Sequence, residues 1–188
     1  VNSSNSEFIA KDSNTIEYGL AGIKNVGYKS TQKLVNYRKK HGEFQTIFDL
    51  CKIGSQAMNK KVLESLIKSG ACDSLEGDRA QLYNLIEPAL KFGQRYHDDH
   101  HSNQSNLFTG GSSSTYSYPK LPSIDNWNEK EKLNNEKEVL GFYLSGNPLE
   151  EHLDILTNFT NIGIINSEQM KFNQYKVGGR IFDVKVLY

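Results

Sequence analysis

The sequence GLAGIKNVG at residues 19–27 is followed directly by the polar, helix-compatible run YKSTQKLV at residues 28–35. Apolar residues before Lys24 predict a short helix over residues 16–23, and Gly27 predicts the start of a second helix after a tight turn. Asn25 suits that turn because asparagine tolerates left-handed backbone geometry. The pattern is typical of a helix-hairpin-helix whose turn amides face outward.

The start of the second helix can bind a phosphate group. The first N–H groups of a helix have no partner inside it, the helix dipole places partial positive charge there, and Gly27 has no side chain to block an anion. We therefore predict phosphate contacts from the turn residues Lys24, Asn25, Val26 and Gly27 and from Lys29. A plain corner between two helices is the alternative interpretation.

A second helix pair is predicted over residues 46–70. Thr46 and Asp49 have the spacing of a capping box, and Asn59 is placed to cap the next helix. Lys60 and Lys61 fall in the first turn of that helix, where positive charge opposes the dipole. Two lysines there make more sense if an anion is bound, so we predict phosphate contacts from both; solvated surface charge is the alternative.

The predicted fold class is mainly α, and composition divides the chain into five segments. Asp78 is expected to cap a helix that reaches about Phe92, after which serine, asparagine, glycine and histidine predominate. Val177 and Ile181 begin an alternating pattern typical of a strand. The segments are an extended lead-in (1–15), a tandem helix-hairpin-helix domain (16–92), a flexible linker (93–126), a helical connector (127–174) and the first strand of a small barrel (175–188).

Charge is unevenly distributed along the chain. The 188 residues carry 22 basic and 22 acidic side chains, yet residues 16–70 hold ten lysines and arginines against four acids, a net charge of +6. The predicted hairpins are therefore the basic part of the chain. Cys51 and Cys72 lack metal-binding spacing and fit a reducing, cytoplasmic compartment. No apolar run is long enough to span a membrane, and no metal site is predicted.

A short peptide inside the predicted linker reads QSNLF at residues 104–108. Leu107 and Phe108 are two large apolar residues in an otherwise polar loop, which is typical of a peptide that docks into a partner's pocket. The alternative is a chance pair that folds back onto the domain. The chain begins with Val1 and ends within a strand-like pattern, so we expect it to be a piece of a longer protein.

Three blocks of this sequence, in this order, resemble the alpha subunits of bacterial replicative DNA polymerase III. The blocks are IEYGLAGIKNVG at residues 16–27, NKKVLESLIKSGACDSL at residues 59–75 and EKEVLGFYLSGNPL at residues 136–149. The resemblance extends over nearly the whole chain, and the third block is the most specific. At Asn147 the family usually has histidine.

The resemblance implies a role for each predicted segment. It implies that the tandem hairpins grip duplex primer-template DNA and that Gln104, Leu107 and Phe108 contact the sliding clamp. It further implies that residues from about 175 open an OB-fold, and that other subunits of the replicative holoenzyme are partners. The metal-binding aspartates of the polymerase palm have no counterpart here, so Mg²⁺ is expected only in the parent enzyme, and this fragment should need no cofactor and should not polymerise alone.

Two other functions remain open at this point. A separate DNA-binding or repair module would also use hairpins for a grip without sequence preference, and a purely structural interaction domain would use them without DNA. A polymerase palm with clustered aspartates in the sequence upstream would support the polymerase over the repair module. Absent or salt-insensitive DNA binding would favour the interaction domain.

Overall fold

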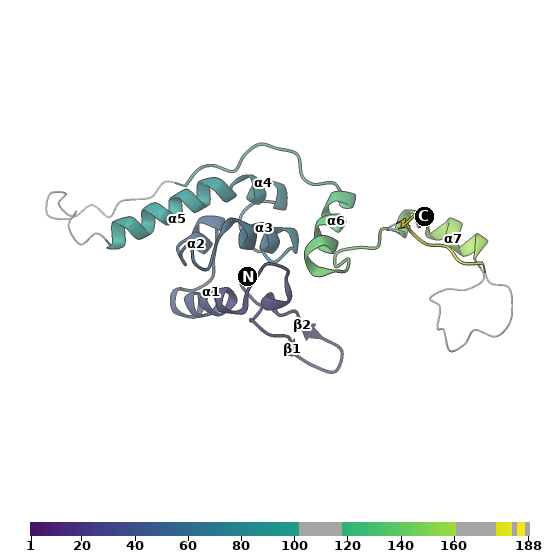
Figure 1. Cartoon of the computed structure of the whole chain (residues 1–188), viewed down its shortest axis with the longest axis horizontal. Coiled ribbons are helices and arrows are strands. Elements are labelled where there is room, and N and C mark those ends of the chain that lie inside the picture. Colours follow the sequence, from purple (N-terminus) through teal and green to yellow (C-terminus); the bar gives the residue numbers. More distant parts are fainter. Residues whose placement is uncertain (102–117, 161–175, 182–183, 187–188) are drawn as a thin grey trace. The chain divides into compact units, whose positions relative to one another are not determined.

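The computed structural model describes residues 1–101, 118–160, 176–181 and 184–186 (Figure 1). The chain divides into two compact units, Val1–Tyr143 and Leu144–Tyr188. The predicted clamp peptide, with Gln104, Leu107 and Phe108, lies outside the described residues.

The first unit is mainly helical, as the sequence predicts. One short antiparallel pair of strands precedes the helices, with Ile9 opposite Glu17 and Ala10 opposite Ile16. The elements, in chain order, are β1 (Ile9–Ala10), β2 (Ile16–Glu17), the 3₁₀ helix η1 (Leu20–Gly22), α1 (Tyr28–His41), α2 (Ile47–Cys51), α3 (Lys60–Lys68), α4 (Arg79–Asn84), α5 (Ile86–His101) and α6 (Glu129–Leu140).

The predicted helix over residues 16–23 is wrong in its first half. Ile16 and Glu17 form β2, and only the single 3₁₀ turn η1 follows. The lead-in explains this, because the N–H groups of Leu20 and Ala21 donate to the carbonyls of Asn5 and Ser6 at 2.8 and 3.0 Å. Pairing with a neighbouring extended segment satisfies these backbone groups, so no helix is needed to do so.

The predicted helix boundaries that depend on capping are confirmed. Thr46 and Asp49 form both hydrogen bonds of a capping box, the side chain of Asn59 accepts the N–H of Val62, and Asp78 caps α4. Gly42 ends α1 with a φ of 90°, a conformation that favours glycine. Each of these boundaries is set by hydrogen bonds between residues close together in the sequence.

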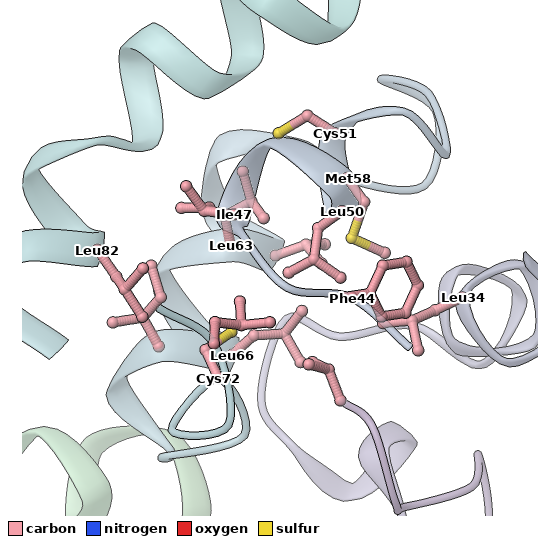
Figure 2. Packing of buried hydrophobic residues seen from close by; sticks show 14 of the residues in the cluster. Leu34, Phe44, Ile47, Leu50, Cys51, Met58, Leu63, Leu66, Cys72 and Leu82 are labelled. Carbon is pink, nitrogen blue, oxygen red and sulfur yellow. The ribbon is translucent and has the colours of Figure 1, made fainter. Parts of the chain in front are cut away.

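One hydrophobic core joins these helices (Figure 2). Side chains from α1, α2 and α3 contribute to it, Phe44 lies beside Leu34, and Leu34, Leu50, Leu63 and Leu66 are completely buried. A fully buried side chain of this size contributes about 1.5–3 kcal/mol to stability. Both cysteines are free thiols in this core, and burial raises the pKa of each to about 12.

The helix expected to end near Phe92 is longer, so the sequence misplaces the start of the linker. α4 ends at Asn84, and α5 then continues to His101. Gly93 marks a close helix contact, because a Cβ atom there would lie 2.6 Å from the carbonyl oxygen of Cys51. After the undescribed residues the chain returns to the core, where Tyr118 stacks on Phe48 with 5.0 Å between ring centroids.

The segment 127–174, predicted to be a helical connector, begins as part of the hairpin domain. Asn128 caps α6, and Gly141 ends it in the left-handed conformation. α6 packs on α3, with an ion pair of 2.7 Å between Lys68 and Glu138. α6 therefore belongs to the first unit and supports the hairpins.

The second unit contains the 3₁₀ helix η2 (Glu150–His152) and α7 (Leu153–Phe159). The Oδ1 atom of Asn147 accepts the N–H of Leu149 at 3.0 Å, so Asn147 forms a turn just before the helical residues begin. Residues 176–181 and 184–186 form no strand, although the sequence predicts one. A strand needs hydrogen bonds to a neighbouring strand, and the described part of this unit contains no such neighbour.

Candidate nucleic-acid interface

The first hairpin turn is fixed from behind by α3 and α6. Asn25 has a φ of 66°, which confirms the left-handed geometry predicted for it. Its side-chain amide donates to the hydroxyl of Ser65 at 3.2 Å, and the N–H of Lys24 donates to the carbonyl of Val139 at 2.9 Å. Val26 turns its side chain into the core, where it is 3% exposed. The turn is therefore a rigid feature of the surface.

Replacing Asn25 with alanine is expected to destabilise the first unit by about 1–2 kcal/mol, because alanine tolerates the left-handed conformation poorly and cannot bind Ser65. Urea unfolding followed by circular dichroism measures this loss. Asn25→Gly is the matched control, since it also loses the hydrogen bond but relieves the backbone strain. Equal losses in both variants would show that backbone geometry at this position contributes nothing.

Only some amides of this turn are available to a ligand. The N–H groups of Lys24 and Val26 already donate to Val139 and Ile23, which corrects the prediction that all turn amides face outward. Gly27 is the N-cap of α1 and makes no side-chain capping bond. The amides of the first turn of α1 therefore have no partner within the helix and attract an anion.

The space in front of Gly27 is open. No atom outside its immediate neighbours lies within 4 Å of a Cβ built at this position, and its φ of −72° is one that any residue can adopt. Gly27 is thus not required by the backbone conformation, but its lack of a side chain leaves the first turn of α1 accessible. Lys24 and Lys29 are exposed on either side of it.

Two further basic residues of α1, Arg38 and Lys33, form hydrogen bonds to other parts of the protein. The guanidinium of Arg38 donates to the carbonyls of Val1 and Ser4 at 2.6 and 2.9 Å, so this charge holds the lead-in in place. The Lys33 ammonium donates to Gln56 in the turn of the second hairpin at 3.2 Å. This contact links α1 to the second helix pair.

The second hairpin presents a less accessible helix start. The side chain of Asn59 already caps α3, and a Cβ built on Gly54, in the preceding turn, would lie 3.2 Å from the ring of His97. Lys60 forms an ion pair with Glu87 of α5 at 2.7 Å, which lowers the pKa of Glu87 and raises that of Lys60. Lys61 is exposed beside it.

A carboxylate also lies beside the first hairpin. The hydroxyl of Tyr28, the first residue of α1, donates to the Oε1 atom of Glu7 at 3.1 Å. Glu7 and Glu87 cannot be recognised from the sequence, because both are distant along the chain from the residues they contact. No local pattern marks either one.

Two kinds of site are absent among the residues that the structure describes. None of their histidine, cysteine, aspartate and glutamate side chains form a group of three or more that could hold a metal ion. Among the same residues, no helix combines the length and the apolar character that a membrane crossing requires.

Comparison with protein families supports the hairpin assignment. A family model described as "Helix-hairpin-helix motif" matches residues 1–82, the part of the chain that holds η1, α1, α2 and α3.

Comparison with curated proteins finds relatives along the whole chain. The chain is 30% identical over 190 residues to the DNA polymerase III subunit alpha of Vibrio cholerae, which matches 100% of this chain. It is 34% identical to that of Buchnera aphidicola subsp. Acyrthosiphon pisum over 99% of this chain, and 37% identical to that of Deinococcus radiodurans over 81%. The chain spans about 16% of the length of the first two relatives and 12% of the third.

Proposed function

Because this chain belongs to the family of DNA polymerase III alpha subunits, of which it spans one segment, we propose that it grips duplex DNA for a replicative DNA polymerase. The observation that carries this proposal is the first hairpin. Its turn is held rigidly, and the start of α1 is uncapped by any side chain and open to an anion. A DNA phosphate fits such a helix start.

The proposed contact is to the sugar-phosphate backbone and therefore carries no sequence preference. Backbone amides near Gly27 would hold one phosphate, and Lys24 and Lys29 would neutralise its neighbours. Lys60 and Lys61 extend the same basic region along the second hairpin. Primer-template duplex is the expected ligand, since its two strands present phosphates at regular spacing.

Duplex binding is expected to weaken with salt. If the hairpins neutralise about four phosphates, the logarithm of the affinity falls with the logarithm of the salt concentration at a slope of roughly −3 to −4. Changing Lys24, Lys29, Lys60 and Lys61 together to alanine should bring this slope close to zero. Fluorescence anisotropy with a labelled duplex at several salt concentrations measures the slope.

The matched control changes four other exposed lysines, Lys39, Lys40, Lys120 and Lys130, to alanine, which alters the net charge by the same amount. Lys39 and Lys40 lie at the far end of α1, about 15 Å from Lys29 at 1.5 Å per residue. This control should keep most of the slope. An equal slope in the two quadruple variants would contradict the assignment of phosphate contacts to the hairpins, and salt-insensitive binding would favour a purely structural role.

We further propose a second contact and an enzymatic context. Gln104, Leu107 and Phe108 would dock on the sliding clamp, and other holoenzyme subunits would join the same assembly. The intact parent would be a cytoplasmic DNA-directed DNA polymerase, with the Mg²⁺ and catalytic aspartates in its palm domain. This chain would hold the DNA, and nucleotidyl transfer would take place elsewhere in the parent protein. The proposal is supported by the names of the relatives and by the resemblance of the sequence.

A further inference from the structure

Each hairpin helix begins with a side chain that contacts a carboxylate from outside the hairpin. Tyr28 is the first residue of α1 and donates to Glu7 of the lead-in at 3.1 Å. Lys60 is the first residue of α3 and pairs with Glu87 of α5 at 2.7 Å. The two carboxylates come from distant parts of the chain, yet each contacts the side chain of the first residue of a hairpin helix.

The two chain neighbours of Glu7, Ser6 and Phe8, fix its position. The carbonyl of Ser6 accepts the N–H of Ala21, and the ring of Phe8 packs edge-on against Tyr18 with 4.6 Å between centroids. The Phe8 ring also covers Gly22, where a Cβ would lie 2.9 Å from it. These contacts tie Glu7 to the turn, although its own side chain stays exposed.

Glu87 is positioned by α5, which packs against both α2 and α3. Its side chain and that of Lys60 are each more than half exposed, so solvent and ligands reach the pair. The contact is therefore open to exchange with another anion.

Glu7 contacts the first residue of α1, whose helix start is open, and Glu87 pairs with the Lys60 ammonium that a DNA phosphate would otherwise contact. Negative charge near a helix start is favourable while the protein is free, because it interacts with the helix dipole. A phosphate is attracted to the same place for the same reason, and two anions close together repel each other. DNA binding must therefore displace or screen each carboxylate.

We propose that Glu7 and Glu87 compete with duplex DNA phosphates at the two hairpins and thereby weaken the grip. This inference rests on the proposed DNA-binding function and adds two residues that set its affinity. A moderated electrostatic grip suits a protein that moves along duplex DNA, because contacts to the backbone must be released and remade at each step.

Replacing either glutamate with glutamine tests the proposal. Glutamine has the same shape and still accepts a hydrogen bond from Tyr28 or Lys60, but it carries no charge. At about 0.1 M salt we expect Glu7→Gln and Glu87→Gln each to tighten duplex binding about threefold, and the double variant about tenfold. The gain should almost vanish near 0.5 M salt, because salt screens charges on the surface.

Glu43→Gln is the matched control. It removes one exposed negative charge just beyond the far end of α1, about 20 Å from Tyr28 along a helix of 14 residues. It should change duplex affinity less than 1.5-fold, which is well below the threefold gain expected of Glu7→Gln and Glu87→Gln. All variants are compared in the whole 188-residue chain by anisotropy, with thermal unfolding confirming equal stability.

The outcomes separate this inference from the proposed function. The wild-type chain could bind duplex through its hairpin lysines while Glu7→Gln and Glu87→Gln bind no better than Glu43→Gln. That result would contradict the competition between glutamates and phosphates and leave the proposed duplex binding intact. A gain that persists at 0.5 M salt also overturns the competition, because it reflects a change of conformation rather than of charge. If the wild-type chain does not bind duplex at all, both proposals fail together.

Discussion

Replacing Arg79 with methionine is expected to lower the free energy of unfolding of the first unit by about 3–5 kcal/mol. Arg79 donates from one guanidinium nitrogen to Glu136 of α6 at 2.9 Å and from two others to Asp73, each at 2.7 Å. Glu136 is 0% exposed. Methionine keeps much of the packing but removes the guanidinium that pairs with the completely buried carboxylate of Glu136, which is the costly part of the change.

Chemical denaturation by urea measures this loss, and two controls isolate its cause. Lys68→Met removes the ion pair with Glu138, which is half exposed, so it should cost less than about 1 kcal/mol. The double variant Arg79→Met/Glu136→Met removes both charges and should recover a large part of the stability, because apolar pairs often replace buried ion pairs at little cost. A loss below 1 kcal/mol for Arg79→Met alone would show that α6 is not held by this pair.

Replacing Leu107 and Phe108 together with alanine is expected to abolish measurable binding to the sliding clamp. A peptide that docks loses conformational freedom, so the gain has to come from burial of these two side chains, worth about 1.5–3 kcal/mol each. Gln104 would add orientation through its hydrogen bonds. Loss of both apolar side chains should therefore weaken the contact by a factor of at least about 100.

The measurement is a paired titration of each variant against the cognate clamp and against duplex DNA. Ser105→Ala/Asn106→Ala is the matched control within the same peptide, and it should keep its clamp affinity because neither side chain is assigned to the contact. Duplex affinity should be equal in all three proteins. Retained clamp binding in the Leu107/Phe108 variant would show that these residues have no role in clamp binding. A parallel loss of DNA affinity would show that they pack on the hairpin domain.

Local hydrogen bonding explains which features the sequence analysis predicted correctly. A cap joins residues two or three positions apart, so Thr46, Asn59 and Asp78 mark their helices whatever the rest of the chain does. The left-handed conformation of Asn25 is a property of its residue type in a tight turn.

The predictions that were wrong concern residues whose local pattern fits two different structures. Gly93 marks the composition of a linker, but it also permits close contact between a helix and the backbone of Cys51, and only the packing shows which role applies. Residues 16–23 have helical spacing, yet the lead-in supplies strand partners that the pattern cannot anticipate. In both cases a contact from a distant segment overrode the local preference.

The sequence by itself therefore determined the capped starts of α2, α3 and α4, the basic hairpin region and the family of this protein. Only the tertiary structure decided which amides remain available, since Lys24 donates its N–H to Val139, 115 positions away. It also decided that Tyr28 and Lys60 meet Glu7 and Glu87. The physical reason is that capping and helical propensity act within one turn of the chain, whereas the partners of a surface charge or a spare amide are set by how separate elements pack.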